Sequence, residues 1–129
     1  MSDMDNKMPA DNSLKILPDG IIQLTQTGYQ TLESVGQFQT KIDDVVMQNH
    51  EQGKKALILV DMTGVTGHDP AAREEGKLRL RGEYDGLAIF GTNVTIRMIV
   101  NWLIHASGQE DKVRFFGKRD EALEWLHSL

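Results

Sequence analysis

Three short apolar segments constrain the fold of this chain more than any other feature. Residues 56–62 (ALILVDM), 87–91 (LAIFG) and 112–116 (KVRFF) each lie between turn-forming residues. The first segment is apolar without alternation, which is typical of a strand buried on both faces of a helix-covered sheet. We therefore predict three core strands of a parallel or mixed sheet.

Helical periodicity precedes and follows the first of these strands. Apolar side chains recur every three or four positions over residues 29–45, and Gly53 stands where a helix C-cap glycine belongs. After the strand, Asp69 and Pro70 are typical of an N-cap and a first helical position. The apolar helical stripe consists of Tyr29, Leu32, Val35, Phe38, Ile42 and Val45.

Two more helices are predicted in the C-terminal part. One covers residues 95–107 and ends at Gly108, and the other covers residues 118–129, with acidic residues at its start, where the helix dipole favours them. The first presents the apolar face Ile96, Ile99, Val100 and Leu103, and the second packs Ala122, Trp125, Leu126 and Leu129.

The N-terminal part completes the order of elements. Residues 14–25 contain two β-prone runs around the turn residues 18–20 (PDG), which predicts a hairpin. The order ββαβαβαβα indicates an α/β fold with a mixed, mostly parallel sheet of about five strands and about four helices. With 129 residues the chain fits one domain, placed at residues 14–129, and residues 1–13 are predicted to be a poorly ordered polar tail.

Composition excludes several classes of function. The chain has no cysteine, which excludes disulfides and thiolate chemistry, and its net charge of −5 argues against binding of nucleic acid. No apolar run approaches the roughly 20 residues of a membrane helix, and the start lacks a secretory signal, so we expect a cytoplasmic protein. The four histidines have no zinc-site spacing and no glycine-rich phosphate loop occurs, so we expect no metal and no cofactor.

The order of elements, with LILVDMTGVTG after a long first helix, resembles the STAS-like fold of anti-sigma-factor antagonists. The segments LAIFGTNVTIRMIVNWLIHASG, KVRFF and EALEWL are similar to the bacterial SpoIIAA-like family, small proteins related to STAS and CRAL-TRIO domains. The likeness covers residues 14–129 and rests on apolar and topological features. It implies a regulatory or protein-interaction module, or, through the CRAL-TRIO relation, a module that binds a lipid.

The resemblance also bears on phosphorylation. In phosphorylatable STAS antagonists, the loop after this strand carries an Asp-Ser-Ser-Gly motif in which a serine accepts phosphate. The matching positions here are residues 69–72 (DPAA), so the aspartate is present and both serines are absent. The resemblance therefore implies a module without the usual phosphoacceptor, in which Thr63 and Thr66 are the hydroxyls that remain upstream.

Ligands of open α/β sheets tend to bind beyond the carboxyl ends of the strands. The predicted loops there are residues 63–69, 91–95 and 117–118. Their polar residues either form a site for a ligand or partner, or serve as turn and cap residues, and we favour the local role for any single residue. The candidates for a site are Asp61, Thr63, Thr66, His68, Asp69, Thr92, Asn93 and Arg97.

Three of these residues are the only candidates for catalysis. Asp61 either acts as a general base or metal ligand, or caps its loop by accepting backbone N–H bonds, which we favour. A dyad of His68 and Asp69 lacks a recognisable nucleophile, and adjacent side chains rarely point at one substrate atom. We therefore expect that the protein is not an enzyme, and a small hydrolase that uses Asp61, His68 and Asp69 is the least favoured alternative.

Basic side chains are most frequent in residues 73–119, which contain nine basic and six acidic residues. On a helix, Arg73, Lys77 and Arg81 would form one stripe. This stripe either contacts an acidic partner or an anionic lipid surface, or it is a solvated face among neighbouring glutamates. The mixed charge favours the solvated face.

Met98 and Trp102 lie on one face of the predicted helix over residues 95–107. They either line an apolar ligand pocket or a subunit interface, or pack in the core, which we favour because large apolar side chains dominate ordinary packing. The sequence thus favours a non-enzymatic regulatory or protein-interaction module with an unknown protein partner. The alternative is a binding module for a lipid or another small apolar or anionic ligand, which requires an internal cavity. A homodimer is compatible with the apolar helix flank.

Overall fold

The computed structural model describes residues 8–80 and 82–129, whose five strands form one sheet in the order β1-β2-β3-β4-β5. β1 is antiparallel to β2, and all other neighbours are parallel. This mixed, mostly parallel sheet confirms the predicted fold class and order of elements. The strands are β1 (Asp11–Ile16), β2 (Ile22–Gln30), β3 (Leu57–His68), β4 (Gly86–Phe90) and β5 (Val113–Phe116).

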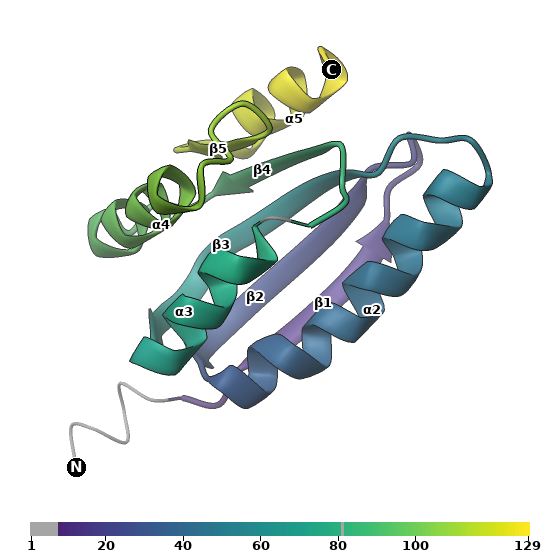
Figure 1. Cartoon of the computed structure of the whole chain (residues 1–129). Helices are drawn as coiled ribbons and strands as arrows, with labels where there is room; N and C mark the ends of the chain where they lie inside the picture. The colour runs from purple at the N-terminus through teal and green to yellow at the C-terminus, as the bar shows by residue number, and fades with distance from the viewer. Residues whose placement is uncertain (1–7, 81) are drawn as a thin grey trace.

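Helices cover both faces of the sheet. Figure 1 shows α2, α3 and α4 side by side on one face and α5 on the other. The core is accordingly divided into two apolar clusters, one between the sheet and α2–α4 and one between the sheet and α5. The helices are α2 (Leu32–Glu51), α3 (Pro70–Arg79), α4 (Val94–Ser107) and α5 (Arg119–His127).

The start of α2 is fixed by a capping box. Thr31 Oγ1 accepts a hydrogen bond from Ser34 N–H, and Ser34 Oγ accepts one from Thr31 N–H. The cap places Tyr29 before the helix, in β2, where it pairs with Gly67. The predicted helical stripe is therefore wrong at Tyr29, whereas its later positions lie in α2.

The ends of the other predicted helices agree with the structure except at the C-terminus. Gly53 and Gly108 both follow helix ends with φ +71°, as their sequence positions predict. In α5, Ala122 and Leu126 are fully buried. Leu129 lies beyond the last residue of this helix and is 41% exposed, so its predicted core position is wrong.

The sheet includes part of the predicted N-terminal tail. Tyr29 N–H donates to the Met8 carbonyl at 2.7 Å, Pro9 forms a bridge with Tyr29, and β1 begins at Asp11. The predicted boundary at residue 14 is therefore too late, because the hairpin pairing begins at Asp11 and residues 8–9 also contact β2. Residues 1–7 of the predicted tail lie outside the described residues.

β3 is longer than the sequence indicated. The predicted loop at residues 63–69 is wrong for most of its length, because the strand continues to His68. A Cβ at Gly64 would lie 2.7 Å from Thr27 Cγ2, so the glycine allows β2 and β3 to stay in close contact there. Residues 58–61 pair with both neighbours, Leu57 pairs with β4 alone, and the later part of β3 pairs with β2 alone, with two shifts of register.

Candidate functional site

A largely apolar cavity of about 120 Å³, partly open to solvent, lies between the sheet and the helices α2, α3 and α4. Its floor is formed by β2, β3 and β4, and its walls come from the three helices. The strands contribute Leu24, Ile58, Val60 and Ile89, and the helices contribute Val35, Ile42, Ala72, Leu80, Val100 and Leu103.

Helix α3 forms the roof of this cavity with one face. Ala72 and Gly76 are four residues apart on α3, so they lie on the same side of the helix. Leu80 directly follows the helix and its N–H donates to the Gly76 carbonyl at 3.0 Å, and all three residues line the cavity. Ala72 is buried, and Leu80 packs against the core. A Cβ built on Gly76 would meet no other atom within 4 Å. The missing side chain at position 76 therefore leaves space beneath α3.

Buried polar atoms belong to the same region. Gln26 and His68 both line the cavity, and Gln26 Oε1 and His68 Nδ1 are buried without a hydrogen-bond partner among the described residues. Arg73 Nε, on α3, is also buried without a hydrogen-bond partner among the described residues. An unpaired buried polar atom costs about 1–3 kcal/mol. The site therefore contains unused hydrogen-bonding capacity in an apolar surrounding.

The imidazole of His68 is held in its uncharged form. Burial lowers the pKa of His68 below its usual 6.5, and the positive charge of Arg73 lowers it further, whereas Asp69 opposes the shift. A neutral imidazole has one ring nitrogen that donates and one that accepts. At neutral pH, His68 thus presents the cavity with hydrogen-bonding groups and no net charge.

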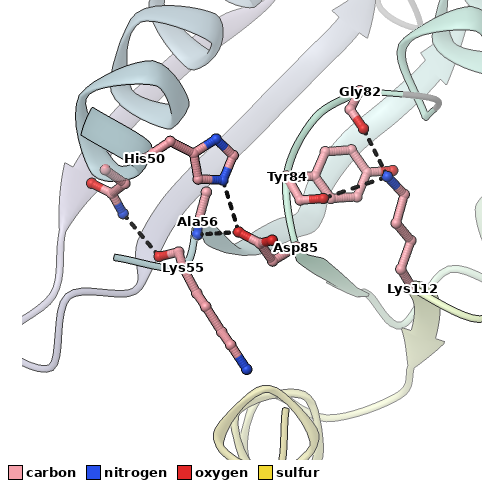
Figure 2. Close-up of polar contacts among 8 residues, drawn as sticks. His50, Lys55, Ala56, Gly82, Tyr84, Asp85 and Lys112 are labelled. Carbon is pink, nitrogen blue, oxygen red and sulfur yellow. Dashed lines mark hydrogen bonds and ion pairs between the residues drawn. The ribbon is translucent and has the colours of Figure 1, made fainter. Parts of the chain in front are cut away.

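Tyr84, which is buried, also lines the cavity. Figure 2 shows Lys112 Nζ beside the Tyr84 ring, 4.5 Å from its centroid, and donating to the Gly82 carbonyl at 2.7 Å. The Tyr84 hydroxyl donates to the Leu80 carbonyl at the end of α3. Burial raises the pKa of Tyr84, so its hydroxyl remains protonated. Tyr84 therefore holds α3 to the sheet at this end.

A second polar cluster stabilises the loop around Tyr84. Asp85 Oδ2 accepts from Ala56 N–H at 2.7 Å and lies 2.9 Å from His50 Nε2 (Figure 2). Burial raises the pKa of Asp85, but the hydrogen bonds from Ala56 and His50 outweigh it and lower the pKa overall. These contacts join the end of α2 to the starts of β3 and β4, which indicates a structural role.

A larger hollow of about 460 Å³ lies on the surface near the start of α2. Ser34 and Asp69 line it, but Ser34 belongs to the capping box and Asp69 Oδ1 accepts from Ala72 N–H at 2.7 Å. These two polar side chains already serve the helix ends. The cavity beneath α3 is apolar and contains buried polar atoms without a partner among the described residues, so it is the candidate site.

The predicted catalytic residues do not come together. Asp61 Oδ1 accepts from the backbone and hydroxyl of Thr63, and Asp69 is the N-cap of α3, as the local interpretation predicted. Asp61 and His68 are seven residues apart on β3, roughly 20 Å at the rise of an extended strand. The three side chains of the predicted hydrolase thus share no site.

The remaining candidates at the carboxyl ends have local or exposed positions. Asn93 Oδ1 accepts from Ile96 N–H and caps α4, whereas Thr92 and Arg97 are exposed beside it. Thr66 is exposed on β3. None of these four residues lines the cavity.

Of the predicted basic stripe, only the side chain of Arg73 lies within the described residues. Arg73 is half-buried rather than solvated. Arg81 and the side chain of Lys77 lie outside the described residues.

Met98 and Trp102 are on the surface, so their predicted core position is wrong. Together with Val94 they form a stripe along α4, and the three side chains are 70% (Val94), 68% (Met98) and 57% (Trp102) exposed. They do not line the cavity either. The opposite face of α4, with Ile96, Val100 and Leu103, packs against the core as predicted.

The sequence analysis missed Gln26, Gly76 and Tyr84, which all line the cavity. Two signals for them were present in the sequence. Gln26 continues the alternation of Ile22 and Leu24, which places a polar side chain on a core face. Gly76 lies in the interior of α3, where glycine is unfavourable for a helix.

Two further searches of the described residues bear on function. In residues 8–80 and 82–129, no three or more histidine, aspartate or glutamate residues are grouped so that they could hold a metal ion. Among the helices of these residues, none has both the length and the apolar character that crossing a membrane requires.

Comparison with known proteins supports the fold. Residues 19–129 match the family described as Domain of unknown function (DUF7793). The chain is also similar to the crystal structure of an uncharacterized protein from the DUF3478 family with a SpoIIAA-like fold, from Shewanella loihica PV-4. The two chains are 20% identical with a TM-score of 0.60, over 91% of this chain and 93% of that chain. This similarity confirms the predicted SpoIIAA-like fold, and no curated protein matches the chain.

Proposed function

Because this chain belongs to the DUF7793 family, whose description assigns no function, we propose one from the geometry: a non-enzymatic module that binds a small, mostly apolar ligand. The observation that carries the proposal is the largely apolar cavity of about 120 Å³ beneath α3. An engineered apolar cavity of roughly 150 Å³ is known to bind benzene. The cavity as it stands therefore suits a compact ligand of about that size rather than a long lipid chain.

The cost of the cavity supports the same proposal. At ~24 cal/mol per Å³, an empty cavity of this volume reduces stability by an amount on the order of 3 kcal/mol. A side chain at position 76 would fill part of it and would also favour the helix. A ligand that occupies the space would recover part of that free energy by burying its own apolar surface.

Gly76→Leu tests the proposal, because the new side chain would occupy the cavity. Toluene is the probe, and its binding is measured by calorimetry and by the shift in melting temperature. We expect toluene to stabilise the natural protein and Gly76→Leu to weaken binding at least about tenfold. Gly36→Leu is the matched control, since Gly36 is also helical and open to substitution but does not line the cavity. Equal binding by the natural protein and Gly76→Leu, or no binding by either, would contradict the proposal.

The exposed stripe of α4 favours a second function, docking to another protein. Val94, Met98 and Trp102 expose most of their apolar surface, and contiguous apolar surface of this kind is typical of interaction sites. Isologous contact with a second copy is the simplest arrangement. This function is compatible with the regulatory role that the SpoIIAA-like resemblance implies, and it does not require the cavity.

Sedimentation velocity over a range of concentrations tests docking to a second copy. We expect the natural protein to self-associate and Trp102→Lys to remain monomeric with an unchanged melting temperature. Arg97→Lys, a conservative change at an exposed position of the same helix, is the control and should self-associate normally. If the natural protein is monomeric at every concentration, the proposal of a homodimer is wrong.

A further inference from the structure

The polar side chains that line the cavity differ in how they are bonded. Gln39 Nε2 donates to Asp43 Oδ1 at 2.9 Å, so its amide has a partner on α2. Gln26 Oε1 and His68 Nδ1 have none within the described residues. The Tyr84 hydroxyl also has a partner, the Leu80 carbonyl, so two of the four polar residues of the lining retain a free hydrogen-bonding atom.

Neighbouring glutamines of β2 show that unpaired amides are not general in this strand. Gln23 Oε1, on the α5 face, accepts from Arg119 Nη2 at 3.0 Å. Gln30 is fully buried, and its amide bonds with Asn12, Ser34 and the Thr27 carbonyl. Gln26 alone of these three glutamines has a buried acceptor without a donor, and it alone lines the cavity.

The surroundings disfavour a charged ligand. The rest of the lining is mostly apolar, and transfer of an ionised group from water into such a space is strongly unfavourable without a partner of opposite charge. Arg73 does not line the cavity, so its charge is not presented to a ligand there. A carboxylate also has no donor for Gln26 Oε1.

We propose that the ligand is a compact neutral molecule with a hydroxyl or N–H group that donates to Gln26 Oε1. This inference rests on the proposed function, because it names the chemistry of the ligand in the same cavity. The apolar part of the ligand lies against Ala72, Gly76 and Leu80. Phenol is the smallest aromatic probe with these properties, and toluene and benzoate are its apolar and charged counterparts.

Binding of phenol, toluene and benzoate is measured by calorimetry for the natural protein and for Gln26→Leu. The quantity of interest is the ratio of the phenol affinity to the toluene affinity, because the ratio removes effects of cavity volume that both probes share. We expect Gln26→Leu to reduce this ratio about tenfold, which corresponds to ~1.4 kcal/mol. Benzoate should bind the natural protein more weakly than phenol.

Two further variants keep the result interpretable. Gln39→Leu removes a lining amide that is already bonded to Asp43, so it should leave the ratio unchanged. Gln26→Met replaces the amide with an unbranched side chain of similar length, and it provides the same test if Gln26→Leu does not fold.

The outcomes separate this inference from the proposed function. If toluene binds and Gly76→Leu blocks it, but Gln26→Leu leaves the ratio unchanged, the inference is wrong and the proposed function stands. Preferential binding of benzoate would overturn the neutral ligand in the same way. If no probe binds and Gly76→Leu changes nothing, both are wrong. A reduced ratio in Gln26→Leu with a normal ratio in Gln39→Leu supports the inference.

Discussion

On the face of the sheet that α5 covers, Leu59, Ala122 and Leu126 are completely buried, whereas on the opposite face α3 lies over a cavity of about 120 Å³. Both layers are built on the same strands. A single helix fills its side with a compact apolar cluster, and three helices on the other side leave space between them and the sheet (Figure 1). Close packing is therefore within reach of this fold, and the cavity is a local property of the face beneath α3.

The two faces also differ in how they treat a buried glutamine. Gln23 points to the α5 face and is paired with Arg119, whereas Gln26 points to the cavity with an unpaired Oε1. Buried polar groups are hydrogen-bonded in most native structures, and exceptions are expected where a site has another role. The comparison assigns stability to the α5 face and ligand binding to the α3 face.

The largest expected effect comes from truncation on the α5 face. Leu126→Ala should lower the free energy of unfolding by about 3 kcal/mol, because a fully buried leucine leaves a new cavity in a filled layer. Leu80→Ala is the counterpart on the other face. It should cost only about 1 kcal/mol, because Leu80 is partly exposed and already borders empty space. Urea denaturation measures both.

Equal losses of unfolding free energy in Leu126→Ala and Leu80→Ala would contradict the difference in packing between the two faces. They would mean that Leu80 is as well packed as Leu126, and that the space beneath α3 is closed in solution. If the loss of stability in Leu80→Ala disappears when toluene is added, the cavity on the α3 face is supported, because the probe then replaces the deleted atoms.

The next effect separates two glutamines of one strand. Gln30→Leu should lower the free energy of unfolding by about 2 kcal/mol, because it leaves the polar groups of Asn12 and Ser34 that bond to the amide without this partner. Gln26→Leu should be neutral or stabilise the protein by up to about 1 kcal/mol, because it removes an unpaired acceptor. Urea denaturation of both variants gives the difference. A marked loss in Gln26→Leu would show that its amide is satisfied, which would contradict its assigned role.

Much of the fold could be predicted because the signals for it are local. The apolar run at residues 56–62, the turn around Asp19 and the caps at Asp69 and Gly108 are each encoded within a few residues, and all are present in the structure. The length of β3 could not be predicted this way. It depends on contacts such as that of Gly64 with Thr27 in the neighbouring strand, which the periodicity of β3 does not contain.

The site was less predictable because it depends on how elements are spaced in three dimensions. The stripe of Met98 and Trp102 has the spacing of a core face, and only the position of α4 at the edge of the helical layer exposes it. The cavity depends on α3 being held away from the sheet. Gly76 was visible only as a weak point in a helix, and its meaning follows from the empty space below it.

A smaller gain in stability is expected from Gly76→Ala. Alanine favours a helix interior by about 1 kcal/mol over glycine, and a methyl group in the cavity adds up to ~0.8 kcal/mol by burial. Gly36→Ala in α2 provides the matched control, because it should show the helix term without the burial term. Thermal and urea denaturation of the two variants give the difference. An equal gain in both would indicate that the methyl group at position 76 reaches solvent instead of the cavity.

The smallest effect is a pH dependence confined to the cavity face. Burial lowers the pKa of His68 in the folded state, so below pH 6.5 the unfolded chain binds the proton more readily, and stability decreases as pH falls. We expect stability to fall between pH 7 and pH 5.5, with a slope of at most ~1.4 kcal/mol per pH unit, the limit for one proton. Asp19 and Asp85 also have lowered pKa values, but their contribution is lost only at more acidic pH, nearer 3.8.

Variants at two histidines assign this pH dependence to the correct face. His68→Gln should remove the loss between pH 7 and pH 5.5, whereas His105→Gln, on the exposed side of α4, should retain it. Phenol that binds beside the neutral imidazole should raise the free energy of unfolding at both pH values without reducing the loss, because it binds the folded state and leaves protonation of the unfolded chain unchanged. If His68→Gln keeps the pH dependence of the natural protein, the imidazole is solvated, and the cavity face is more open than the structure shows.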